Sequence, residues 1–544
     1  MAEPLHQVLR LARERFGFDD LRPGQAEAIE SVLAGRDTLA VLPTGSGKSA
    51  IYQLPALLLD GPTLIVSPLI ALQRDQVENL LDGPGLKAAQ ANSAIGASAR
   101  RSALERVASG DLEFLFLAPE QLRKDDVIEA IQAAKPSLFV VDEAHCISGW
   151  GHDFRPDYLL LDAVIEQLGR PTVLALTATA SPPVRAEIVE RLGMRDPTVV
   201  VRGFDRPNIH LDVEAFLEER HKRKAMIERC LDTPGPGLVY AATRKQTEEL
   251  AADLSAAGLR SAAYHAGMAA QNRERVHEAF VNDELDVVVA TTAFGMGIDK
   301  PNVRYVFHYA ISESLDSYYQ EIGRAGRDGE PAHAVLFFRN EDLGLRRFFA
   351  GGAELGAHQL LGVAVTVARS DGPVELTELA ERTGLSQTKL TTAVSRLEEA
   401  GAVELLPGGE VVAVEGGAHP VDAAEEAARN EEARVRVEQS RVEMIRGYAE
   451  ARSCRREYLL NYFGEQVGGA CGNCDNCTKA GDEGVAADDL VVPFAQDQRV
   501  VHREWGEGLL VRADADTITV LFDDVGYKTL SLRLLMEHDL LRAV

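Results

Sequence analysis

The chain has 544 residues, 46% of them hydrophobic and 26% charged, and carries a formal net charge of −27. At about 150 residues per domain, this length predicts roughly three to four domains of ordinary globular composition. The acidic balance argues against a protein that coats nucleic acid through bulk charge, although a local basic channel needs only a few placed Lys and Arg side chains. No run reaches the ~18 apolar residues of a membrane span, and the N-terminus lacks a signal-peptide core, so we expect a cytoplasmic protein that does not contact membranes.

Short apolar runs alternate with helical stretches over the first part of the chain. The runs lie at 37–42, 63–68, 112–119, 137–143, 172–179, 237–242, 261–266, 286–292, 303–310 and 334–338. A strand that is buried on both faces is a continuous apolar run, and alternation of such strands with helices is typical of a doubly wound parallel α/β sheet. The pattern predicts two similar lobes, 1–201 and 202–345, joined near 199–208.

The pattern changes after residue 345. Residues 346–420 predict a helix, a turn at Gly384, a second helix and two strands, which is winged-helix-like patterning. Residues 421–480 predict a module with one long helical stretch, 423–463, followed by a cysteine cluster, and 481–495 predict an acidic linker. The last segment, 496–544, alternates in hydrophobicity between turn signals and predicts a small β-barrel.

A glycine-rich stretch follows the first predicted strand and opens a helix. Its candidate nucleotide-binding residues are Thr44, Gly45, Ser46, Gly47, Lys48 and Ser49. The glycines let backbone N–H groups approach phosphates, Lys48 would reach the β- and γ-phosphates, and Ser49 would hold Mg²⁺. Leu42 replaces the first glycine of the full phosphate-loop pattern, so a glycine-rich turn without a nucleotide stays the alternative.

Two further segments supply the groups that nucleotide hydrolysis needs. In VVDEAH, Asp142 at a strand end would coordinate Mg²⁺ through water, and Glu143 would orient and deprotonate the attacking water. The stretch 318–329 offers Arg324 and Arg327 to the developing charge on the γ-phosphate, if the lobes close over the nucleotide. A pair of surface arginines on a helix is the alternative, but three glycines in twelve residues make a poor helix.

Four of the six cysteines form a metal-binding pattern. They are Cys454, Cys471, Cys474 and Cys477. Four thiolates are the set that structural Zn²⁺ binds tetrahedrally, and a closed four-thiolate site leaves no open position, so its role would be structural. An iron–sulfur cluster is the alternative.

In order along 16–329, these segments resemble the motifs of RecQ-family helicases of superfamily two. The resemblance implies RecA-like folds for both lobes. FGFDDLRPGQ resembles the family's adenine-recognition motif, which implies that Phe18 stacks on the base while Arg22 and Gln25 hydrogen-bond to it. Further resembling segments are 67–76, 118–122, 177–180, DRPN at 205–208, 264–268 and 291–304.

CISGWGHDFRPDY, which directly follows the carboxylate pair, resembles the aromatic-rich loop of RecQ helicases. The resemblance implies a single-stranded DNA contact in which Trp150 and Phe154 stack on bases and Arg155 takes a phosphate. Base–aromatic stacking contributes ~1–3 kcal/mol per base. The alternative is that Trp150 is a core residue. Gly149 departs from the family pattern, where a glutamine is expected.

The C-terminal half resembles the family in part. CRREYLLNYFGE and the cysteine cluster resemble the RecQ zinc module, but the winged-helix-like segment precedes that module here instead of following it. The predicted recognition helix, 386–400, sets Lys389 and Arg396 against Glu398 and Glu399. DNA contact and a packing role both stay open for this helix.

The tail, 496–544, resembles the Tudor-like tail of UvrD/PcrA helicases, and the whole arrangement resembles a divergent, RqlH-type RecQ clade. The acidic tail disfavours DNA as its ligand. We expect Phe522 and Tyr527 to fill its core and Trp505 to stay partly exposed. An exposed aromatic side chain on a small acidic module favours a protein partner, with RNA polymerase or a repair factor as candidates.

The resemblance implies a DNA helicase that uses ATP, Mg²⁺ and Zn²⁺, translocates 3′ to 5′ and unwinds duplexes in DNA repair or recombination. Its expected substrates are single-stranded and forked DNA, and its expected place is the nucleoid. Two alternatives stay open: a DNA-dependent translocase that unwinds weakly, and a DNA-binding regulator with a vestigial motor.

Overall fold

The fold is taken from a computed structural model. The structure describes residues 2–68, 70–81, 86–148, 155–294, 300–350, 355–370, 372–406, 410–465, 470–480, 494, 498–513, 517–523, 525–532, 535 and 540–544. The aromatic side chains Trp150 and Phe154 and most of the predicted acidic linker lie outside these residues. Among the described helices, none combines the length and apolarity that crossing a bilayer requires.

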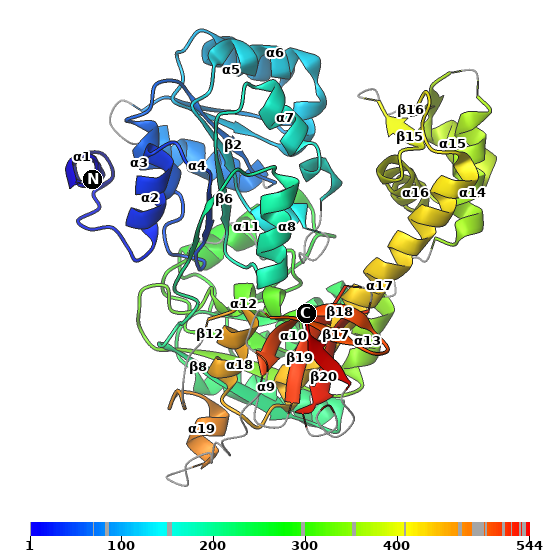
Figure 1. Ribbon diagram of the computed structural model, residues 1–544. Coiled ribbons are helices and arrows are strands. Elements are labelled where there is room, and N and C mark those ends of the chain that lie inside the picture. The colour runs from blue at the N-terminus through cyan, green and yellow to red at the C-terminus, as the bar shows by residue number, and fades with distance from the viewer. Residues whose placement is uncertain are drawn as a thin grey trace. The chain divides into compact units, whose positions relative to one another are not determined.

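The first lobe is a parallel sheet in the order β3-β4-β2-β5-β6-β1-β7, with helices on both faces (Figure 1). Its strands are β1 (Thr38–Val41), β2 (Thr63–Val66), β3 (Ala88–Ala91), β4 (Phe114–Leu117), β5 (Leu138–Val141), β6 (Thr172–Thr177) and β7 (Thr198–Val201). Its helices are α1 (Ala2–Phe16), α2 (Gln25–Leu33), α3 (Ala50–Ala56), α4 (Ile70–Leu81), α5 (Ala97–Ala108), α6 (Asp125–Ala134), α7 (Leu161–Gln167) and α8 (Pro182–Arg191). Strands β1, β2, β4 and β5 are buried along their whole length, as continuous apolar runs predict.

The second lobe repeats this architecture with a parallel sheet in the order β10-β11-β9-β12-β13-β8. Its strands are β8 (Ile209–Ala215), β9 (Gly237–Tyr240), β10 (Ser261–Tyr264), β11 (Val287–Ala290), β12 (Tyr305–His308) and β13 (Ala332–Phe338). Its helices are α9 (Glu219–Asp232), α10 (Arg244–Ala256), α11 (Ala270–Val281) and α12 (Leu315–Ile322), followed by α13 (Asp342–Ala350). The prediction of two doubly wound lobes is confirmed.

The winged-helix segment has the predicted helix–turn–helix and a small antiparallel sheet in the order β14-β16-β15. Its elements are α14 (Ala357–Ala368), β14 (Val374–Glu375), α15 (Leu376–Thr383), α16 (Gln387–Glu399), β15 (Val403–Leu405) and β16 (Glu410–Ala413). Gly384 ends α15 in the left-handed region at φ 68°, which glycine adopts without a Cβ penalty. The core of this segment extends past residue 420, because Ala423, Ala424 and Ala427 pack into it.

The zinc module begins with the long helix α17 (Pro420–Glu450), followed by α18 (Arg455–Tyr462) and α19 (Asp475–Ala480). The predicted continuous helical stretch is broken between α17 and α18, where Cys454 is the N-cap residue of α18. Cys471 and Cys474 lie just before α19, and Cys477 lies within it.

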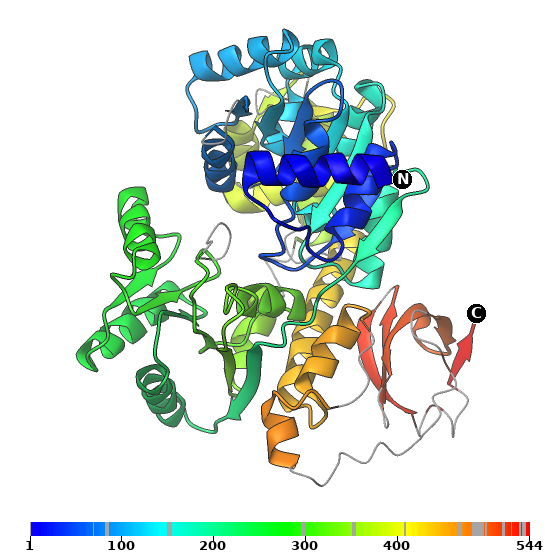
Figure 2. The same ribbon diagram turned by 90° about the vertical axis from the view of Figure 1, so that its left-hand side faces the viewer.

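The tail forms a curved antiparallel sheet in the order β20-β19-β18-β17-β21 (Figure 2). Its strands are β17 (Arg499–His502), β18 (Gly506–Ala513), β19 (Thr517–Phe522), β20 (Gly526–Ser531) and β21 (Leu541–Ala543). Phe522 and Tyr527 are buried and Trp505 is half-buried, as expected from the sequence.

Candidate active site and metal centre

The phosphate loop lies between the end of β1 and the start of α3. Gly45 and Gly47 have φ angles of 80° and 75°, in the left-handed region where a side chain would be strained. The Lys48 ammonium donates a hydrogen bond to the Leu42 carbonyl, with Nζ 3.2 Å from the oxygen. The loop therefore has the backbone that a phosphate cradle needs, with its lysine folded over it.

Lys48 lies among the predicted catalytic groups. Burial lowers the pKa of Lys48, the Glu143 and Asp142 carboxylates raise it, and Arg327 lowers it further. All four side chains are therefore close enough to interact. Strands β5 and β1 flank β6 in the sheet, which brings the carboxylates and the phosphate loop to the same edge.

The carboxylate pair follows β5 directly. Glu143 has φ 48°, a left-handed conformation that costs a non-glycine residue about 1–3 kcal/mol and is characteristic of functional sites. Its Oε2 lies 3.3 Å from Nδ1 of the buried His145, and that nitrogen is also 2.9 Å from the Thr177 hydroxyl. Burial and the adjacent Glu143 raise the pKa of Asp142 to about 7. A cation bound at this pair would relieve the repulsion between the two carboxylates.

The predicted Mg²⁺ ligands, Ser49 and Asp142, face the same tyrosine. Burial raises the pKa of Tyr52, the Asp142 carboxylate raises it further, and a hydrogen bond with Ser49 lowers it. A hydroxyl and a carboxylate oxygen beside a phosphate loop are the donors that Mg²⁺ prefers. The residues present therefore fit the ion.

The predicted adenine-recognition residues lie against the phosphate loop. The Gln25 amide nitrogen donates to the Ser46 and Gly47 carbonyls at 3.0 and 2.9 Å, and its Oε1 accepts from the Arg22 backbone N–H at 2.8 Å. The Arg22 guanidinium donates to the Gly45 carbonyl. The motif is thus tied to the loop that would hold the phosphates of the same nucleotide.

Phe18 is available for stacking. Its ring lies parallel to that of Phe16, with centroids 5.8 Å apart and an interplanar angle of 14°, and Phe18 is 40% exposed. A planar, exposed aromatic face suits a purine base. The roles of these residues stay predictions.

The candidate arginines follow α12. Arg324 is buried, at 5% exposed, and Tyr240 at the end of β9 has its pKa raised to about 12 by burial, with Arg324 and Arg327 acting against that rise. The Arg327 side chain lies against the phosphate loop, since its Cδ would be 3.4 Å from a Cβ at Gly45. The structure therefore brings Arg327 to the predicted nucleotide site.

The predicted DNA-contacting loop is described only at its two ends. The Arg155 backbone N–H donates to the Cys146 carbonyl at 2.8 Å, and the Tyr158 hydroxyl donates to the Asp142 carbonyl at 3.0 Å. The Arg155 guanidinium donates to the Pro68 carbonyl at 3.3 Å. The loop therefore starts and ends at the strand end that carries the carboxylate pair.

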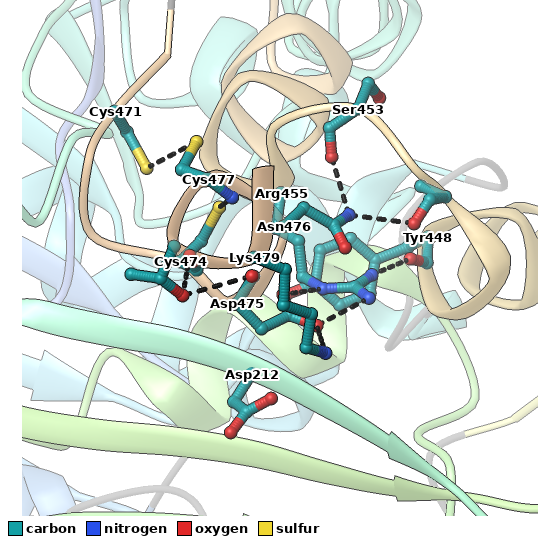
Figure 3. A network of polar contacts seen from close by, with 12 residues as sticks. Asp212, Tyr448, Ser453, Arg455, Cys471, Cys474, Asp475, Asn476, Cys477 and Lys479 are labelled. Carbon is teal, nitrogen blue, oxygen red and sulfur yellow. Dashed lines mark hydrogen bonds and ion pairs between the residues drawn. The ribbon is translucent and has the colours of Figure 1, made fainter. Parts of the chain in front are cut away.

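The four cysteine sulfur atoms of the predicted zinc site lie within 4.8 Å of one another. The Cys471 and Cys477 sulfurs are 3.9 Å apart, one of the contacts drawn in Figure 3. Zinc–sulfur bonds of about 2.3 Å in a tetrahedron place sulfurs about 3.8 Å apart. The cluster therefore has the donors and the spacing of a structural zinc site.

A buried ion pair supports this cluster. Arg455 contacts Asp475 through two nitrogens at 2.5 and 3.0 Å and donates to the Tyr448 carbonyl at 2.7 Å (Figure 3). Burial opposes ionisation of Asp475, but the hydrogen bonds and positive charges of Arg455 and Lys479 together outweigh it and lower the pKa of Asp475. The Asn476 amide donates to the Ala451 and Ser453 carbonyls at 2.8 and 2.7 Å, which fixes the segment before Cys454.

Several residues at the site have contacts to which the sequence patterns assigned no role. They are Gln73, Asn92, His145, Thr177 and Arg206. Gln73 donates to the Ser67 carbonyl at 2.7 Å and accepts from Asn92 at 2.9 Å, which ties α4 to the chain after β3. All except Asn92 lie in segments that resemble family motifs or lie next to the carboxylate pair. Their place in these segments is the sequence signal that could have identified them.

Two parallel-sheet lobes, a phosphate loop and an acidic pair at the same sheet edge define a superfamily-two helicase motor. Family models match in the same order: DEAD/DEAH box helicase at 22–187, helicase conserved C-terminal domain at 221–329, winged helix-turn-helix DNA-binding at 368–404 and RecQ zinc-binding at 421–478.

The chain is 36% identical to the probable ATP-dependent DNA helicase RecS of Bacillus subtilis, over 86% of this chain and 90% of that protein. It is 35% identical to the ATP-dependent DNA helicase RecQ of Pasteurella multocida, over 87% of this chain and 63% of that one. The chain belongs to the RecQ family of DNA helicases.

Solved structures share the fold. A Mycobacterium smegmatis helicase Lhr bound to single-stranded DNA and AMP-PNP has a TM-score of 0.52 at 21% identity, covering 79% of this chain and 62% of that one. The DUF1998 helicase MrfA bound to DNA has a TM-score of 0.54 at 17% identity, covering 78% of this chain and 60% of that one.

Proposed function

We propose that this chain is an ATP-dependent DNA helicase that translocates 3′ to 5′ on single-stranded DNA and unwinds forked duplexes during repair or recombination. It would act in the cytoplasm on the nucleoid. The observation that carries the proposal is the meeting of Lys48, the Asp142–Glu143 pair and Arg327 at one edge of the first sheet. Membership of the RecQ family supports DNA as the substrate.

The site residues divide the chemistry among them. Glu143 would orient and deprotonate the attacking water, while Lys48 and the two arginines neutralise charge on the γ-phosphoryl group as its bond to the nucleotide breaks. Mg²⁺, when bound at Ser49 and Asp142, supplies positive charge to the phosphate oxygens. Closure of the lobes on ATP and reopening after hydrolysis would move the strand.

The DNA loop would couple the strand to hydrolysis. Its ends bond to Asp142 and Cys146, so a base stacked on Trp150 or Phe154 acts on a segment that begins at the catalytic carboxylates. Because the segment is short and contiguous, DNA binding can be coupled to ATP hydrolysis without a pathway through the rest of the protein.

The test compares ATP hydrolysis with and without single-stranded DNA and strand displacement on duplexes with 3′ or 5′ tails. Glu143→Gln should bind ATP but lose nearly all turnover, because it removes the base and keeps the fold. Glu166→Gln, an exposed carboxylate in the same lobe, is the matched control and should keep wild-type turnover. Substantial hydrolysis by the Glu143→Gln variant, or displacement from 5′ tails only, would contradict the proposal.

A second candidate is a translocase that unwinds weakly, and the recognition helix of the winged segment favours it. Arg396 lies 2.7 Å from Glu431 and 3.3 Å from Glu399. The arginine on which a phosphate contact would depend is therefore already paired with two carboxylates. Strand displacement per ATP hydrolysed separates the two candidates: a coupled helicase displaces strands in proportion to hydrolysis, whereas a translocase hydrolyses without displacement.

The tail supports a further proposal, contact with a protein partner such as RNA polymerase or a repair factor. Trp505 stacks on His502 with centroids 4.2 Å apart and meets Phe522 edge-on, so one face is fixed in the module while the side chain stays half-exposed. A rigid, partly exposed indole is a common anchor in protein interfaces. Pull-down with Trp505→Ala as the control tests it, and partner binding that is unchanged in this variant would refute it.

A further inference from the structure

The segment Phe204–Asn208, here called the interlobe segment, joins the two lobes and contains the DRPN motif. Within it, Arg206 donates to the Gly323 carbonyl at 3.0 Å through Nη1 and to the Ala325 and Gly326 carbonyls at 2.8 and 3.0 Å through Nη2. A planar guanidinium is suited to collect several acceptors in one fixed geometry. The three carbonyls belong to the turn 323–327, here called the finger turn, which carries the two candidate catalytic arginines.

Asn208 holds the same turn. Its amide nitrogen donates to the Gly326 and Glu330 carbonyls at 2.8 and 2.9 Å. Gly326 has φ 55°, and a Cβ there would collide with the Asn208 amide. The finger turn is therefore bound by two side chains of the interlobe segment and has no room to shift toward them.

The zinc module holds the interlobe segment from outside. The Phe204 ring lies parallel to that of Phe463 at a centroid distance of 4.7 Å and an angle of 4°. Three polar side chains of the module add hydrogen bonds: Arg456 to Asp205 at 3.1 Å and to the Ile209 carbonyl at 2.7 Å, Glu465 from the Phe204 N–H at 3.0 Å, and Asn473 to the Pro207 carbonyl at 2.9 Å.

We propose that Arg206 and Asn208 are positioning residues for Arg324 and Arg327, and that the zinc module supports them by fixing the interlobe segment. This inference rests on the proposed function, because it assigns the finger turn a part in ATP turnover. The competing reading is that Arg206 only caps α12 and contributes to stability.

The expected loss of kcat on removing Arg206 follows from the role of the finger turn. An arginine finger contributes about a thousandfold to turnover, and displacement of a reacting group by about 1 Å costs about a hundredfold. Arg206→Ala should therefore lower kcat by about a hundredfold while KM for ATP changes by less than about threefold. Arg206→Lys should not restore kcat, because one ammonium cannot hold three carbonyls in the geometry of the fork. Recovery in the lysine variant would mean that charge alone matters and would overturn the proposal.

A double-variant cycle separates positioning from stability. In a background that lacks both candidate arginines, Arg324→Ala with Arg327→Ala, Arg206→Ala should lower kcat by less than about threefold more, since residues that act as one unit are non-additive. Losses that multiply would overturn the proposal. Arg339→Ala is the matched control, because Arg339 is a partly buried arginine of the same lobe paired with Asp342 at 2.9 Å, and it should keep wild-type kcat.

Hydrogen exchange tests the geometry without relying on activity. Arg206→Ala should speed amide exchange over 323–329, and Arg339→Ala should not. Unchanged exchange over 323–329 would overturn the inference even if kcat falls. If the wild-type protein fails to hydrolyse ATP with DNA, the proposed function fails, and the exchange experiment still decides whether Arg206 holds the turn.

Two adjacent arginines test the part of the zinc module. Arg456 contacts the interlobe segment, whereas Arg455 contacts only the module's own residues among its described hydrogen bonds. Arg456→Ala should keep its zinc and lower kcat by about tenfold through looser positioning. Arg455→Ala should weaken zinc binding instead. An Arg456→Ala protein with wild-type kcat would overturn the supporting role of the module.

Discussion

Replacing Asp475 by alanine is the sharpest test of how the zinc module is stabilised. The side chains of Arg455 and Asp475 are only 4% and 3% exposed, and their two contacts measure 2.5 and 3.0 Å. Without the carboxylate, the guanidinium keeps its bond to the Tyr448 carbonyl but is left as a buried, unpaired charge. Breaking a buried pair in this way costs about 3–5 kcal/mol.

The assay is competition for zinc against a chelator. Binding of the metal and folding of the module are coupled, so a cost of about 3–5 kcal/mol lowers apparent zinc affinity roughly a hundred- to a thousandfold or more. The double variant Arg455→Met with Asp475→Leu should recover most of that loss, because an apolar pair leaves no buried charge. Zinc affinity within about threefold of wild type in Asp475→Ala would refute this reasoning.

Trp150→Ala should keep DNA-free ATPase and lose DNA stimulation, because a stacked base contributes ~1–3 kcal/mol; a variant that unfolds would show that Trp150 is a core residue. Gly326→Ala should lower DNA-stimulated kcat at least as much as Asn208→Ala does. The added Cβ would collide with the Asn208 amide, and alanine is strained at φ 55°. A Gly326→Ala protein with wild-type kcat would contradict this prediction. Deleting 490–544 should leave DNA-stimulated ATPase largely intact but lower the unfolding temperature, because it removes the Arg512 guanidinium that lies 3.6 Å from the centre of the Tyr458 ring. Loss of unwinding in the purified system would instead favour a direct DNA role for the tail.

The apolar runs predict the inner strands of both sheets but, of the four edge strands, only β10. β3 is Ala-Ala-Gln-Ala at one end of its sheet and is only partly buried, so it offers no apolar run. β8 lies at the edge of the second sheet and alternates apolar with polar residues. β7 is a valine run that overlaps the predicted connection between the lobes. Edge strands need less apolar surface, which is why a search for continuous apolar runs misses β3 and β8.

The candidate site was predictable where its chemistry is local. The phosphate loop, the carboxylate pair and the cysteine spacing each lie within a few residues and carry a direct physical reason. The part of Arg206 was not predictable, because it depends on carbonyls more than a hundred residues further along the chain. The pairing of Arg396 with Glu431 on α17 is a similar long-range contact, and it neutralises one of the two positive charges that the sequence places on the recognition helix.

The anchoring of the aromatic loop bears on how such a motor could be modified. Cys146 with Arg155 and Asp142 with Tyr158 close the loop with bonds that involve backbone atoms at its base. We therefore expect that residues 149–154 can be exchanged for other sequences while these bonds keep the carboxylates in place. Chimeras that carry loops from other relatives would then differ in which nucleic acid triggers hydrolysis and share the same basal rate. Exchange of these few loop residues would then be a way to engineer the nucleic-acid preference of this protein.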